Sequence, residues 1–155
     1  MASYHVNPAS GDVSPCRARK RCPFGTPEEH FTEQAKARRY YELLNEPKFV
    51  LKLNHEQLSA LRRSADFREK PGDEDLMARL EVEEDNRYYG GGERQKFSVL
   101  ELERIAEIAE EKREHFDLDG RLSRHDRGVA TRLYTVWDHA LIAAEEGRAA
   151  LRAVG

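Results

Sequence analysis

Residues 5 to 30 constrain the fold of this chain more than any other stretch, because they combine its only two cysteines with two histidines. His5, Cys16, Cys22 and His30 follow the pattern H-x10-C-x5-C-x7-H, and proline, glycine and charged residues occur between them. Such a segment has too few apolar side chains to fold by burial. Two thiolates and two imidazoles are a ligand set that zinc takes in tetrahedral geometry. We therefore predict a metal-stapled N-terminal module, in which ion binding replaces the missing core.

The predicted site is structural, because four protein ligands would leave no open position for a reactive water. Basic residues between the cysteines favour the thiolate form that zinc binds. The spacing is not the C-x2-C of the common zinc fingers. Two ordinary free thiols, or a disulfide in a secreted protein, are the alternatives for Cys16 and Cys22, and His5 alone could be a surface residue.

The same residues carry a resemblance. YHVNP, the cysteines within CRARKRCPFG, and EEHF before a helix ending in YYE resemble an N-terminal segment of uncharacterised actinobacterial and actinophage proteins. The resemblance covers only about residues 1 to 42, and all four candidate ligands fall inside it. It implies a recognition or docking module that precedes different bodies, with a phage- or prophage-related role.

The sequence as a whole predicts a mainly α-helical protein. We expect a zinc-binding module with one helix at 1–45, and an α-helical body of about four helices with one short strand at 46–155. Helices are expected from about residues 32 to 45, from 54, from 73 to about 87, from 98 to about 114, and from about 123. FVLKL at 49–53 is the expected strand. Two capping boxes, Asn54 with Gln57 and Ser98 with Glu101, mark helix starts.

A second, weaker ion-site candidate lies at residues 115–126, HFDLDGRLSRHD. Asp117, Asp119, Ser123 and Asp126 fall at ligand positions of an EF-hand loop, with Gly120 at the conserved turn. His115 at the first position and an aspartate at the last are departures from that pattern. We favour an ordinary turn between two helices, and calcium is not expected.

The other polar features favour plain structural roles. Glu81, Glu83, Glu84 and Asp85 predict a solvated helix face. Gly90 to Gly92 lack the residues of a phosphate-binding loop and are expected to form a flexible joint. No nucleophile motif occurs, so we do not expect an enzyme.

The function expected from the sequence is a non-enzymatic docking protein that binds another protein. The alternative is nucleic-acid binding through the basic zinc loop, Arg17, Arg19, Lys20 and Arg21. The net charge of −3 argues against that alternative. The sequence contains neither a membrane-spanning apolar run nor a secretory signal, so a cytoplasmic location, or a virion if the protein is phage-encoded, is expected.

Overall fold

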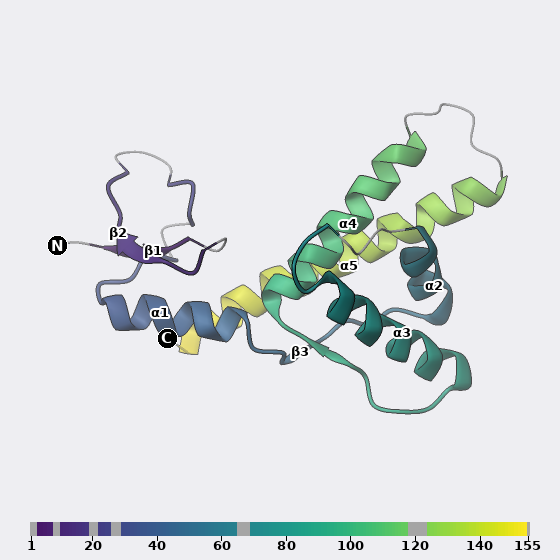
Figure 1. Ribbon diagram of the computed structural model, residues 1–155, viewed down its shortest axis with the longest axis horizontal. Coiled ribbons are helices and arrows are strands. Elements are labelled where there is room, and N and C mark those ends of the chain that lie inside the picture. The colour runs from purple at the N-terminus through teal and green to yellow at the C-terminus, as the bar shows by residue number, and fades with distance from the viewer. Residues whose placement is uncertain are drawn as a thin grey trace. The chain divides into compact units, whose positions relative to one another are not determined.

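The computed structural model describes residues 3–7, 10–18, 22–25, 29–64, 69–117 and 124–154, and the chain is mainly helical, as the sequence predicts (Figure 1). The helices are α1 Gln34–Leu44, α2 His55–Ser64, α3 Asp73–Tyr89, α4 Val99–Asp117 and α5 Arg124–Val154. The strands are β1 Tyr4–Val6, β2 Val13–Pro15, β3 Phe49–Val50 and β4 Lys96–Phe97. None of the helices in these described ranges is both long enough and apolar enough to cross a bilayer.

The chain divides into two compact units. The N-terminal unit comprises Met1–Glu46 together with Glu146–Gly155, and the helical unit comprises Pro47–Glu145. From the sequence, all of 46–155 was expected to belong to the body, whereas the C-terminal segment groups with residues 1–46 in the structure. The reason is that Leu151 is buried there and Arg148 pairs with Glu29.

The helical unit has an apolar core drawn from all its helices. The largest of its fully buried apolar side chains are Leu58, Leu61, Leu80, Phe97, Val99, Leu102, Ile105, Ile108, Leu133 and Val136. Both predicted capping boxes are confirmed. The Asn54 amide donates to Gln57 Oε1 (3.0 Å) while the Gln57 amide donates to Asn54 Oδ1 (2.8 Å). The Ser98 amide donates to Glu101 Oε1 (2.8 Å), and the Glu101 amide to Ser98 Oγ (3.1 Å).

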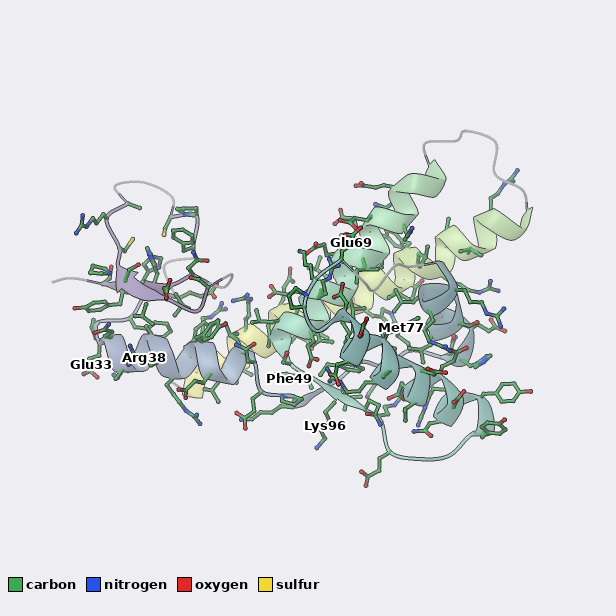
Figure 2. All side chains as sticks on the ribbon, in the orientation of Figure 1. Glu33, Arg38, Phe49, Glu69, Met77 and Lys96 are labelled. Carbon is green, nitrogen blue, oxygen red and sulfur yellow. The ribbon has the colours of Figure 1, made fainter. Side chains whose placement is uncertain are left out.

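The strand expected at 49–53 is shorter than predicted. β3 pairs antiparallel with β4, with Phe49 opposite Phe97 and Val50 opposite Lys96. Leu51 and Leu53 continue the chain into the core without further pairing. The Lys96 side chain extends away from this pair (Figure 2). Strands β1, β2 and β4 were not expected from the sequence.

The prediction that Glu83 and Glu84 lie on a solvated face is wrong. They are only 1% and 6% exposed. Glu83 accepts from the Gln95 amide (2.5 Å) and pairs with Arg87 Nε (3.0 Å). Glu84 pairs with Arg62 Nη1. Arginine side chains compensate both carboxylates, and this compensation makes their burial tolerable.

The Gly90–Gly92 loop is braced by the end of α3. Gly90 and Gly92 have φ values of 71° and 82°, the left-handed region that favours glycine. Arg87 Nη2 donates to the carbonyl oxygens of Gly91 (3.3 Å) and Gly92 (3.0 Å). The loop is therefore hydrogen-bonded to the helix that precedes it, and its expected flexibility stays a prediction.

Candidate metal centre

A two-stranded hairpin positions the first two candidate ligands. β1 and β2 pair antiparallel, with His5 opposite Ser14. Side chains of directly opposed residues lie on the same face, and Ser14 Oγ accordingly lies 3.2 Å from His5 Nε2. Cys16 comes directly after β2, where its amide extends the ladder by donating to the Ser3 carbonyl oxygen (2.7 Å). The hairpin therefore aligns His5 and Cys16 through the backbone.

A bridge between residues far apart in sequence positions the second histidine. Tyr4 and Phe31 form an isolated antiparallel bridge, with N···O distances of 2.7 and 2.9 Å. His5 follows Tyr4 and His30 precedes Phe31, so the bridge brings the two imidazoles together. Their ring centroids are 5.6 Å apart, with the planes nearly perpendicular at 86°.

Cys22 directly precedes a turn, and its sulfur lies next to His5. The Phe24 amide lies 3.5 Å from Cys22 Sγ, in donor position. A thiolate is stabilised by such an N–H donor. Cys22 Sγ is also 3.5 Å from His5 Nδ1. The Phe24 ring packs over His5, with 5.0 Å between centroids.

The four side chains offer ligand atoms that all lie within 4.8 Å of one another. For sulfur at about 2.3 Å and nitrogen at about 2.0–2.1 Å from a tetrahedral ion, the S···N separation would be about 3.6 Å. The 3.5 Å between Cys22 Sγ and His5 Nδ1 matches that value. Both cysteines are free thiols. His5, Cys16, Cys22 and His30 thus lie close enough to bind one metal ion.

The electrostatics of the cluster favour a neutral His5. Burial lowers the pKa of His5 below its usual value of 6.5, and the neighbouring His30 lowers it further. A neutral imidazole is the form that binds a metal. With Nε2 next to Ser14 Oγ, the other ring nitrogen, Nδ1, is the one that faces Cys22.

The residue next to His30 makes contacts that the sequence did not reveal. Glu29, directly before His30, accepts from Tyr40 Oη (2.9 Å) on α1 and from Arg148 Nη1 (2.6 Å) on α5. Arg152 Nη1 lies 3.9 Å from the other carboxylate oxygen. Arg148 is 119 positions from Glu29 in the sequence, and no local pattern links the two residues.

The other candidate site residues fall largely outside the described part of the chain. Arg17 is described and exposed. Arg19, Lys20 and Arg21, the rest of the candidate nucleic-acid contact, lie outside the described residues. In the candidate cation loop, Asp119 and Ser123 lie outside them, as do the side chains of Asp117 and Asp126.

Comparison of the chain with protein-family models, with curated proteins and with solved structures found no match in any of the three.

Proposed function

We propose that His5, Cys16, Cys22 and His30 bind a structural zinc ion, and that the protein acts as a non-enzymatic docking protein. The observation that supports the metal site is that four nitrogen and sulfur ligand atoms all lie within 4.8 Å of one another. A mixed thiolate–imidazole set favours zinc over magnesium or calcium, which prefer oxygen ligands.

The scarcity of apolar burial supports a structural role for the ion. Among the described residues 3–31, Val6 is the only buried apolar side chain. Metal binding then supplies the free energy that a hydrophobic core would otherwise provide. Because four protein ligands saturate zinc, the ion would hold the module together without exposing a reactive position.

Zinc stoichiometry and coordination test the metal part. We expect about one zinc per chain, lost in the Cys16→Ser, Cys22→Ser variant. His139→Ala is a matched control, since His139 is an exposed histidine of the helical unit. Cobalt substitution should give a four-coordinate spectrum that azide does not change. An azide-sensitive spectrum would show an open position and argue for a reactive metal instead.

The docking part is tested by capture from cells, compared between the wild-type chain and the Cys16→Ser, Cys22→Ser variant. A protein bound by the wild-type chain and lost in the variant supports docking through the module. A partner retained by the variant at equal affinity would remove the module from the proposed interface.

The exposed basic residues of the N-terminal unit favour nucleic-acid binding as a second candidate. Arg17, Lys36 and Arg38 are exposed, and Arg38 is labelled on α1 in Figure 2. Replacing Arg17, Arg19, Lys20 and Arg21 by glutamine should weaken DNA or RNA binding at low salt and reduce its salt dependence. Replacing Arg63 and Lys96, exposed on the helical unit, is the control. Equal binding by both variants would refute this role for the loop.

A further inference from the structure

Glu29 connects the candidate metal centre to the C-terminal segment. It directly precedes His30 and its side chain is only 12% exposed. Its carboxylate accepts hydrogen bonds from Tyr40 Oη at 2.9 Å and Arg148 Nη1 at 2.6 Å. Glu29 and His30 thus share a stretch of backbone, through which a displacement of His30 can reach the carboxylate that binds Arg148.

The C-terminal segment is turned toward this carboxylate. Arg148 and Arg152 are 19% and 28% exposed, and both have Nη1 within 4.0 Å of a Glu29 oxygen, at 2.6 and 3.9 Å. Leu151, between them, is 4% exposed, and Gly147 is also buried. The Glu29 carboxylate thus lies close to two guanidinium groups of the last turns of α5, which belong to the N-terminal unit.

Little apolar burial holds the segment that carries Glu29 in place. Val6 is the one buried apolar side chain among the described residues 3–31. The Tyr4–Phe31 bridge contributes two backbone hydrogen bonds next to His30. A single bridge of this kind is weak in water, whereas structural zinc supplies much more free energy.

We propose that metal binding at His5, Cys16, Cys22 and His30 controls the attachment of the segment Glu146–Val154 through Glu29. This inference rests on the proposed metal site and deepens it. With the ion bound, His30 is fixed and Glu29 pairs with Arg148 and Arg152. Without the ion, Glu29 loses its fixed position and the two arginines lose their common acceptor, so the segment detaches.

The consequence concerns the C-terminal end of α5. Residues 146–154 belong to the N-terminal unit, whereas the preceding part of this helix belongs to the helical unit. The metal centre would therefore act as a switch for how the C-terminal end is held within the N-terminal unit.

Hydrogen exchange on the full chain tests this proposal, with and without zinc. We expect the amides of residues 146–154 to exchange at least about tenfold faster after chelation, the order expected for losing a charge-assisted contact. Residues 133–144 of the same helix belong to the helical unit and are the internal control. Zinc content is measured on the same samples.

The zinc site and its coupling to residues 146–154 can be refuted separately. No zinc in freshly reduced protein would overturn the proposed function. One zinc per chain with unchanged exchange at 146–154 after chelation would leave the zinc module standing and overturn this inference.

Variants provide a test that does not require the metal-free state. Glu29→Gln and Arg148→Gln should each retain about one zinc while exchange at 146–154 rises, again by about tenfold. Glu33→Gln, an exposed residue at the start of α1 (Figure 2), is the matched control. Zinc-loaded Glu29→Gln and Arg148→Gln proteins with wild-type exchange would refute the coupling. If either variant fails to fold, the wild-type comparison alone decides.

Discussion

Ser14 Oγ lies 3.2 Å from His5 Nε2, directly across the β1–β2 ladder. A hydrogen bond to the second ring nitrogen orients a metal-binding histidine, and it selects the nitrogen left for the ion. Ser14 is therefore a positioning residue for the candidate metal centre.

Ser14→Ala should weaken zinc binding by about 10–100-fold, because His5 loses the group that fixes its ring. Competition with a chromophoric chelator measures the affinity. Ser14→Thr keeps the hydroxyl and should restore affinity to near the wild-type value. Equal affinity in the alanine and threonine variants would show that Ser14 does not orient His5.

Arg104→Ala should lower the free energy of unfolding by about 3–5 kcal/mol, because it leaves the buried Asp73 carboxylate uncompensated. Asp73 is 2% exposed, and Arg104 Nε and Nη2 donate to its two oxygens at 3.1 and 2.9 Å. The hydrogen bond from Arg104 lowers the pKa of Asp73 below its usual value of 3.8. Denaturant unfolding measures the change.

The control for Arg104 is Arg39→Ala, which removes the exposed pair between Arg39 and Glu42. Exposed pairs of this kind contribute under about 1 kcal/mol. The contribution of the Asp73–Arg104 pair to the free energy of unfolding should persist at neutral pH. It should disappear as the pH falls below 3.8 and through the lowered pKa of Asp73. Similar losses in both alanine variants would contradict the buried-pair interpretation.

Tyr40→Phe should remove a contribution to the free energy of unfolding that is present below pH 10 and is lost as the pH rises further. Burial, and then Glu29, raise the pKa of Tyr40 from 10.0 to about 12. The folded state therefore favours the protonated phenol. Ionisation should cost the wild-type chain on the order of 2–3 kcal/mol between the two values.

The measurement is the difference in unfolding free energy between the wild-type chain and Tyr40→Phe as a function of pH. That difference should be largest below pH 10 and shrink as the pH approaches 12. Tyr89→Phe, at a tyrosine 81% exposed, is the control. A difference independent of pH would place the pKa of Tyr40 at its ordinary value.

Gly92→Ala should destabilise the helical unit by about 1–2 kcal/mol, because a side chain at φ 82° is strained. An added Cβ would also lie 2.7 Å from Asn86 Cγ. Gly91→Ala is the matched control, since nothing lies within 4 Å of a Cβ there and its φ is not in the left-handed region. Thermal unfolding compares the two, and equal midpoints would show that the loop tolerates an L side chain.

Local patterns predicted the features of this protein that depend on neighbours in the sequence. The capping boxes at Asn54 and Ser98 each depend on residues three positions apart. The starts of α1 and α3 do not depend on such a cap, since Glu33 and Gly72 precede them without a side-chain capping hydrogen bond. The four candidate metal ligands were predictable because a segment with little apolar content and four nitrogen and sulfur ligands has few other ways to fold.

The pattern of acidic residues misled the prediction at Glu83 and Glu84. In sequence they form part of a charged run, and such runs are usually solvated. Their burial depends on Arg62 of α2 and on the Gln95 amide, which lie outside α3. A carboxylate becomes tolerable in a core only when such groups meet it in three dimensions.

The sequence by itself determined the mainly helical class, the helix caps and the four candidate metal ligands, since each depends on residue type and short-range spacing. Only the tertiary structure decided that Ser14 faces His5, that the Tyr4–Phe31 bridge brings His30 to the cluster, and that Glu29 holds Arg148. Those contacts join residues 9, 27 and 119 positions apart. A sequence shows which side chains are charged or can form hydrogen bonds. Which of many possible acceptors a given donor pairs with is decided by the packing of the folded chain.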